Sequence, residues 1–293
     1  MHALVFYLVY PFIWLISILP FKVLYFLSDV FFIVIFRLFR YRKTVVLENL
    51  NLAFPEKSKQ EKEKIAKEFY KHFCDLIFES IKSLSISEEE IKKRFTLINI
   101  EEIQRIENEG KSVVLMMAHY GNWEWIFIMQ RHVKSRGYAV YKRLKNKYFD
   151  KLIKKIRAKY NTELITTKEI IPTLLKAKVK NETSISGFIS DQSPKIDKAY
   201  HWQKFMGIEV PVHTGAEMIA KKLDSSVVFC SVTKIKRGHY QARFKTIAKE
   251  PKGFADFEIT DQFLKLVESQ IHEAPEYYLW THKRWKHRRV SSE

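Results

Sequence analysis

The sequence predicts an α/β fold in which a mixed, largely parallel sheet is flanked by helices and preceded by an N-terminal membrane-anchoring helical segment. Short β-like runs alternate with helical stretches beyond residue 95, which is typical of a parallel sheet. The runs at 227–234 and 240–246 flank the turn-like residues 236–239, which predicts a hairpin and makes the sheet mixed. The first forty residues are almost uncharged, which indicates the anchor.

The composition supports a folded domain that meets an acidic partner. Of 293 residues, 46% are hydrophobic and 14% aromatic, enough for a buried core and against global disorder. Two cysteines, Cys74 and Cys230, are too few for a disulfide scaffold or a cysteine-rich zinc module. The formal charge of +18 predicts contact with an anionic membrane surface, an acidic protein or nucleic acid.

The amino terminus predicts a membrane anchor over residues 1–40. Residues 3–21 form an uncharged run of 19, about enough to cross a hydrocarbon core of roughly 30 Å. Residues 23–36 contain Asp29 as their only charge, so we expect one span plus a helix lying in the interface. A cleaved signal peptide fits less well, because no basic region precedes the apolar run. The arginines that follow predict that residues 41–293 form a cytoplasmic domain held against the inner face of a membrane.

The elements of the domain follow from hydrophobic periodicity. Helical spacing predicts a long amphipathic helix over 58–84. Strands are expected at 95–100, 112–117, 138–141, 184–189, 227–234 and 240–246. Further helices are expected at 123–134, 148–160, 169–179, 214–222 and 261–272.

Several kinds of site are missing from the sequence. It contains no phosphate-binding P-loop, no dinucleotide fingerprint, no serine-hydrolase elbow and no metal-ligand spacing. We therefore expect no cofactor and no metal. The chemistry that remains uses histidine and carboxylate.

The strongest candidate site is the segment 112–124, in which an apolar strand runs into His119-Tyr120-Gly121-Asn122-Trp123-Glu124. Sites in α/β sheets collect at the carboxyl ends of strands, where His119 is expected. Glu124 falls in the first turn of the next helix, from which its carboxylate is expected to reach the imidazole. Such a pair is a general base for a hydroxyl nucleophile. The alternative is structural, with His119 capping a helix and Glu124 complementing its dipole.

These residues resemble the H-x4-[DE] motif of glycerolipid-type acyltransferases. The His119–Glu124 block is similar to the H-x-G-N-W-[DE] form of the late acyltransferases of lipid A biosynthesis, the lauroyl and myristoyl transferases. Similar blocks extend the resemblance over most of the chain, at 49–55, 140–146, 191–192, 205–215 and 274–286. The block at 140–146 departs from the family, which usually has Arg where Lys142 stands, with Arg143 next.

The resemblance implies transfer of a fatty acyl chain from acyl carrier protein to a hydroxyl of a lipid A precursor in the membrane. His119 and Glu124 are the implied catalytic pair, and either Lys142 or Arg143 the oxyanion cation. The implied substrate-binding residues are Asn122, Lys142, Arg143, Asp191 and Gln192. Asp191 and Gln192 can equally form a plain turn. A nucleophilic role for Cys230 is disfavoured, because no base is paired with it.

The basic segments fit the implied partners. Nine Lys or Arg lie between residues 141 and 160, and five between 281 and 289. They suit an acidic carrier protein, lipid phosphates and an anionic leaflet, although much of this charge is also typical of a solvated face. Two alternatives remain: the same chemistry on another acceptor, such as a lysophospholipid, an aminolipid or a pigment hydroxyl, or a tethered nucleic-acid-binding protein. The second leaves the His119 block without a purpose, so no nucleic-acid partner is expected.

Overall fold

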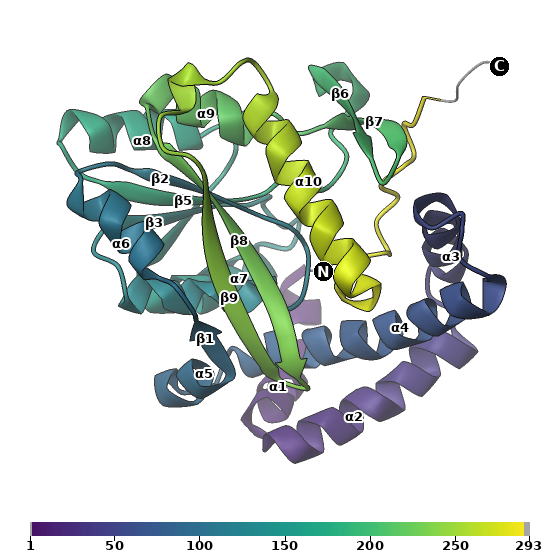
Figure 1. Ribbon diagram of the computed structural model, residues 1–293. Coiled ribbons are helices and arrows are strands. Elements are labelled where there is room, and N and C mark those ends of the chain that lie inside the picture. Colours follow the sequence, from purple (N-terminus) through teal and green to yellow (C-terminus); the bar gives the residue numbers. More distant parts are fainter. Residues whose placement is uncertain (1, 290–293) are drawn as a thin grey trace.

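A seven-stranded sheet forms the centre of the computed structural model, which describes residues 2–289 (Figure 1). Its order is β1-β9-β8-β2-β5-β3-β4, and only the β8–β9 pairing is antiparallel. The predicted mixed, largely parallel sheet and its hairpin are therefore confirmed. The strands are β1 Phe95–Leu97, β2 Val113–Met117, β3 Arg136–Val140, β4 Thr162–Ile165, β5 Ser184–Ile189, β8 Ser226–Lys236 and β9 His239–Ala248.

Helices cover the sheet and extend beyond one edge of it (Figure 1). The long helix predicted over 58–84 is α4, Lys59–Lys82, which begins with a capping box between Ser58 and Glu61. The other α-helices are α1 His2–Ile18, α2 Phe21–Ile33, α3 Lys43–Ala53, α5 Glu88–Arg94, α6 Glu101–Asn108, α7 Lys147–Arg157, α8 Ile170–Val179, α9 Gly215–Leu223 and α10 Glu258–Glu273. The helix predicted at 123–134 is a run of 3₁₀ turns, η2, Trp123–Arg131.

The core explains why β2 lies at the centre. All five of its residues are buried, and the strand pairs with β5 on one side and β8 on the other. A strand buried on both faces reads as a continuous apolar run, which is how it was recognised. A small separate hairpin, β6 His201–Phe205 and β7 Ile208–Val212, was not predicted, and neither was β4.

The structure does not support the predicted transmembrane span. The uncharged run is divided where α1 ends at Ile18 and α2 begins at Phe21, with Pro20 as the N-cap residue of α2. At 1.5 Å per residue, the 17 residues of α1 cover about 26 Å, less than a hydrocarbon core of roughly 30 Å. No helix within residues 2–289 is both long enough and apolar enough to cross a membrane.

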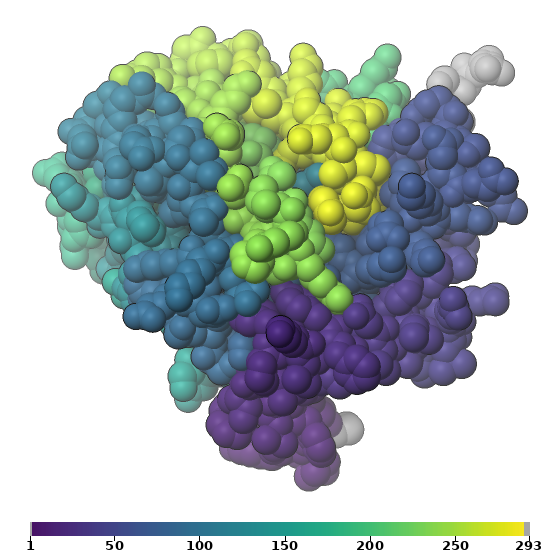
Figure 2. All heavy atoms as spheres, turned by 60° about the horizontal axis from the view of Figure 1, so that its bottom comes forward, coloured from purple at the N-terminus to yellow at the C-terminus, as the bar shows by residue number. Residues whose placement is uncertain are grey.

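The N-terminal helices nevertheless expose apolar side chains while packing on the rest of the molecule. Both α1 and α2 contact α4, and Leu24 is fully buried. Figure 2 shows the N-terminal residues as one continuous purple part of the surface. Large apolar residues exposed there include Leu4, Tyr7, Leu8, Phe12, Leu15, Phe26, Leu38 and Phe39.

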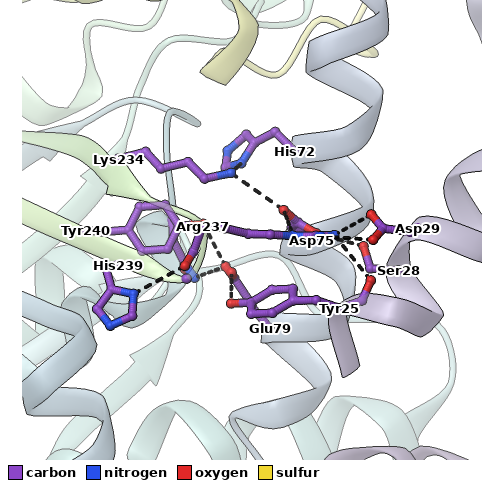
Figure 3. Close-up of polar contacts among 12 residues, drawn as sticks. Tyr25, Ser28, Asp29, His72, Asp75, Glu79, Lys234, Arg237, His239 and Tyr240 are labelled. Atoms are coloured by element: carbon purple, nitrogen blue, oxygen red, sulfur yellow. Dashed lines mark hydrogen bonds and ion pairs between the residues drawn. The ribbon is translucent and has the colours of Figure 1, made fainter. Parts of the chain in front are cut away.

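A polar cluster, buried at Asp75 and exposed at Asp29, joins α2 and α4 to the β8–β9 hairpin (Figure 3). The guanidinium of Arg237 donates to the carboxylates of Asp75 on α4 and Asp29 on α2, at 2.6 and 2.7 Å. Ser28 also donates to Asp75 at 2.8 Å. These contacts fix α2 against the hairpin through charge-assisted hydrogen bonds. The N-terminal helices and the sheet are thus one packed unit.

Candidate active site

His119 lies on a sharply bent loop directly after β2, as predicted. Gly121 makes the bend possible, because its φ of +58° favours glycine. A Cβ atom at Gly121 would also lie 3.0 Å from both the Cγ1 atom and the carbonyl oxygen of Val232 on β8. The loop therefore packs tightly against the neighbouring strand, and any other residue at 121 would displace it.

The segment after α10 holds this loop from the other side. The amide of Leu279 donates to the carbonyl of His119 at 3.1 Å, and the amide of Gly121 donates to the carbonyl of Tyr277 at 3.0 Å. The hydroxyl of Tyr120 donates to the carbonyl of Ala274 at 2.8 Å. Residues far apart in sequence thus fix the backbone that carries His119.

The carboxylate that contacts the imidazole belongs to Asp191, which follows β5. Its Oδ1 atom accepts from Nδ1 of His119 at 2.8 Å and from the backbone amide of His119 at 3.1 Å. Burial raises the pKa of Asp191, but the charge and hydrogen bonds of His119 outweigh burial and hold that pKa below its usual value. An ionised Asp191 accepts a hydrogen bond from the Nδ1–H group of His119. This contact keeps the ring proton on Nδ1 and leaves the lone pair of Nε2 available to accept a proton.

Glu124 does not make the contact predicted for it. Its carboxylate accepts from Nε and Nη2 of Arg157, at 3.0 and 2.5 Å, and from the indole of Trp123 at 3.2 Å. The structure gives no hydrogen bond between His119 and Glu124 within residues 2–289. The prediction placed Glu124 on the following helix correctly, but the bend at Gly121 directs the imidazole to β5 and the carboxylate to α7.

Asn122 has both ends of its amide engaged inside the protein. The side-chain oxygen accepts from the amide of Trp125 at 3.3 Å and caps η2, and the side-chain nitrogen donates to Glu79 on α4 at 2.7 Å. Glu79 also accepts from the hydroxyls of Tyr25 and Tyr240, at 2.8 and 2.9 Å. Burial and, next, the Asp75 charge raise the pKa of Glu79 to about 7, although the hydrogen bonds from Tyr25 and Tyr240 act to lower it. Asn122, predicted to bind substrate, is 1% exposed and instead supports the loop.

The remaining predicted residues divide into two groups. Gln192 lies beside the base, with its Nε2 atom 3.5 Å from Nε2 of His119. Lys142 and Arg143 are exposed on the loop after β3, and Arg143 donates to Glu169 at 2.6 Å. The structure therefore brings Asp191 and Gln192 to the imidazole, and it shows neither cation in contact with it.

The buried thiol of Cys230 has no part in this arrangement. Cys230 lies within β8, and burial raises the pKa of its thiol. A protonated thiol is a poor nucleophile, in agreement with the expectation that Cys230 is not catalytic.

An apolar cavity of about 80 Å³ lies on the far side of Trp123 from the imidazole. Trp123 connects the two, because its ring meets that of His119 edge to face at 5.1 Å and also lines the cavity. Glu124 and Arg157 line the same cavity. Its other walls come from η2 and from strands β2, β3 and β5, including Leu115, Met117, Phe127, Ala139, Ile185 and Ile189. A histidine base beside an apolar cavity is suited to proton transfer on a substrate with an aliphatic part.

This fold and site define an α/β protein with a hydrogen-bonded histidine–aspartate pair at the carboxyl edge of its sheet, and the sequence comparisons identify the family. The bacterial lipid A biosynthesis acyltransferase family matches residues 1–287. The chain is 26% identical over 278 residues to the lipid A biosynthesis lauroyltransferase of Escherichia coli K12, covering 94% of this chain and 89% of that protein. It is 23% identical over 280 residues to the palmitoleoyltransferase of the same organism and to a Shigella flexneri lipid A biosynthesis acyltransferase, covering 95% of this chain and 90% of each.

The chain belongs to the bacterial lipid A biosynthesis acyltransferase family. The resemblance inferred from the His119 block and the later blocks is confirmed, and so is acyltransferase activity at the level of the family. Three contributions were missed: Asp191 as partner of the imidazole, Arg157 as partner of Glu124, and Glu79 as support of Asn122. The only available signal was that Asp191 follows a predicted strand, which places it at the same sheet edge as His119.

Proposed function

We propose that the protein transfers a fatty acyl chain from acyl carrier protein to a hydroxyl of a lipid A precursor, with His119 as general base. The observation that carries the proposal is the His119–Asp191 pair beside the apolar cavity. Membership of the family supports acyl transfer, and the names of the relatives support lipid A as the acceptor class.

The transfer is a single displacement at a thioester. Nε2 of His119 takes the proton of the acceptor hydroxyl as its oxygen attacks the thioester carbonyl. Asp191 stabilises the imidazolium that forms. When the tetrahedral intermediate collapses, the carbon–sulfur bond breaks and the proton passes from His119 to the leaving thiolate. Gln192, beside Nε2, is placed to contact the acceptor hydroxyl, and Lys142 or Arg143 is retained as the oxyanion cation.

The donor side of the site is assigned to the cavity and α7. The acyl chain is assigned to the apolar cavity, which Arg157 at the end of α7 helps to line. The same helix carries Lys151, Lys154 and Lys155. Basic side chains next to the cavity suit an acidic carrier protein that must bring its thioester to His119.

The acceptor side is assigned to a membrane surface. The exposed apolar residues of α1 and α2 form a surface suited to insertion into the interfacial layer of a bilayer. Arg37, Arg40 and Arg42 follow it and suit anionic lipid headgroups. We assign the protein to the cytoplasmic face of the inner membrane on these grounds.

A transfer assay with acyl carrier protein donors and a lipid A precursor tests the proposal. We expect His119→Ala to abolish product formation, because it removes the nitrogen that is proposed to take the hydroxyl proton. Replacing the exposed His132 with Ala is the matched control and should leave the rate unchanged. Retained turnover in the His119→Ala protein would remove the general-base assignment.

A further inference from the structure

A groove of about 520 Å³ lies between α3 and the segment that follows α10. In Figure 1 this yellow segment passes beside α3 and the β6–β7 hairpin. The groove combines an apolar floor with a basic rim. Its lining residues are Val45, Glu48, Asn49, Asn51, Leu52, Lys283, Trp285, Lys286 and Arg288.

The rim has an excess of positive charge. Lys283, Lys286 and Arg288 are exposed, and within residues 2–289 the structure gives none of them an ion pair with a carboxylate. The neighbouring Arg289, in contrast, is paired with Glu209 at 2.7 Å. One lining residue, Glu48, is acidic. Several cations around one acid attract an anion, since each unneutralised charge adds to the local potential.

The charge extends along α3. An adjoining groove of about 420 Å³ shares Glu48 and Asn51 with the first and is lined by Arg40 and Lys43. These residues follow Leu38 and Phe39, two of the most exposed apolar side chains of the N-terminal region. The basic groove is therefore continuous along the chain with the surface assigned to the membrane.

The groove is also connected to His119. Asn49 on α3 donates to the carbonyls of Trp280 and His282, at 2.8 and 2.7 Å, and Leu279 bonds the carbonyl of His119. Lys283 is four residues beyond Leu279, so their Cα atoms are at most about 14 Å apart. The basic rim of the groove is therefore close in space to the loop that carries His119.

We propose that this groove binds a phosphate group of the lipid acceptor. Lys283, Lys286 and Arg288 supply the charge-assisted hydrogen bonds that a phosphate requires, and Trp285, Val45 and Leu52 supply apolar contact for the sugar that carries it. The acidic carrier protein is the less suitable occupant. Its thioester must reach the cavity lined by η2, β2, β3 and β5, whereas the groove is lined by α3 and the segment after α10. This inference rests on the proposed function and assigns a subsite to it.

Steady-state kinetics of a double variant test the site. We expect Lys283→Gln with Lys286→Gln to raise the KM for a phosphorylated acceptor by about 5- to 10-fold, with kcat and the KM for the donor unchanged. The matched control replaces two exposed lysines of the α8 region, Lys176→Gln with Lys180→Gln, and should leave all three constants unchanged. With enzymatically dephosphorylated acceptor, the double variant and wild type should have equal KM values. An equal rise for both acceptors, or no rise, would overturn the proposal.

Two further measurements are needed. One tests whether the bound phosphate comes from the acceptor or from phospholipids, and the other tests the groove without relying on acyl transfer. If the groove serves phospholipid headgroups, the double variant should bind phosphatidylglycerol vesicles less well and keep its KM for acceptor in neutral micelles, which would overturn the proposal. Calorimetric binding of phosphorylated acceptor to His119→Ala protein requires no turnover. Lysine-dependent binding there supports the site even if no acyl transfer is found, so the two proposals can fail separately.

Discussion

At the scale of single residues, one carboxylate acts on the imidazole and another on the cavity. Asp191 accepts the Nδ1 hydrogen bond of His119, while Glu124 is held by Arg157. The two acids therefore have different effects when changed. Loss of the Asp191 carboxylate reduces the basicity of Nε2 of His119. Loss of the Glu124 carboxylate frees the side chain of Arg157, which lines the cavity together with Trp123.

The role of Glu124 can be tested through its partner. If Glu124 acts by holding Arg157, then Glu124→Gln and Arg157→Gln should each lower kcat by a similar factor, about 10²-fold, and the double variant should lose little more. Rates with acyl carrier protein donors of fixed chain length measure this. If Arg157→Gln keeps full activity while Glu124→Gln does not, Glu124 acts on His119 instead, as the sequence suggested.

His119 and its partner show what could and what could not be predicted from the sequence. His119 and the strand before it were predicted, because a buried parallel strand has a recognisable apolar run and its carboxyl end is where sites lie. The partner of the imidazole was not predicted, because Glu124 in the first turn of the next predicted helix was expected to reach back to the ring at the end of the strand. The direction of each side chain depends on the positive φ of Gly121 and on contacts with residues 274–279, which no local pattern reveals.

At the scale of elements, Glu79 links α4 to the loop that carries the base. It accepts hydrogen bonds from Tyr25 on α2, Tyr240 on β9 and Asn122 on the loop. Figure 3 shows Glu79 beside the charged cluster of α2, α4 and the hairpin. The charges nearest to it are those of Asp75 and Lys234, which respectively raise and lower its pKa. Its protonation state therefore affects how firmly three elements are joined.

The raised pKa of Glu79 predicts a pH dependence of stability. The folded protein holds this proton up to about pH 7, whereas the unfolded chain releases it near the ordinary pKa of 4.5. The free energy of unfolding should therefore fall as pH rises between these values. Chemical denaturation at pH 5 and pH 8 measures the fall, which should be smaller in Glu79→Gln. An equal fall in both proteins would show that Glu79 does not take up a proton on folding.

Element boundaries were predicted most closely where burial is strongest. Strand β5 was predicted at its observed residues, and α4, α8 and α10 within a few residues of theirs. The hairpin β6–β7 and the short helices α5 and α6 were missed, because short amphipathic segments gain their stability from neighbours rather than from their own pattern. The run at residues 3–21 was assigned as a span because it is uncharged over 19 residues, but the helix within it ends at Ile18, before Pro20.

At the scale of the whole molecule, the proposed acceptor side combines the apolar surface of the N-terminal helices with the basic groove. Phe12 and Phe26 are 67% and 65% exposed. Transfer of each ring from water to an apolar phase is worth about 1.5–3 kcal/mol. We expect Phe12→Ser with Phe26→Ser to lower partitioning onto anionic vesicles by at least about tenfold.

The control for this prediction lies elsewhere on the surface. Val179→Ser with Ile196→Ser removes two exposed apolar side chains outside the N-terminal helices, 82% and 56% exposed, and should leave vesicle partitioning unchanged. Vesicle sedimentation measures both variants. An equal effect of the two pairs would indicate non-specific adsorption and would contradict the assigned membrane surface.

The hydrogen bonds between residues 274–279 and the His119 loop have a consequence for how the chain folds while it is being synthesised. While the chain is still being made, β2 and its neighbours can be complete when Tyr277 and Leu279 have not yet left the ribosome. During that interval nothing fixes the carbonyl of His119 or the amide of Gly121 in place. The observed geometry of the His119 loop therefore forms only after residues 274–279 are free to pack against it.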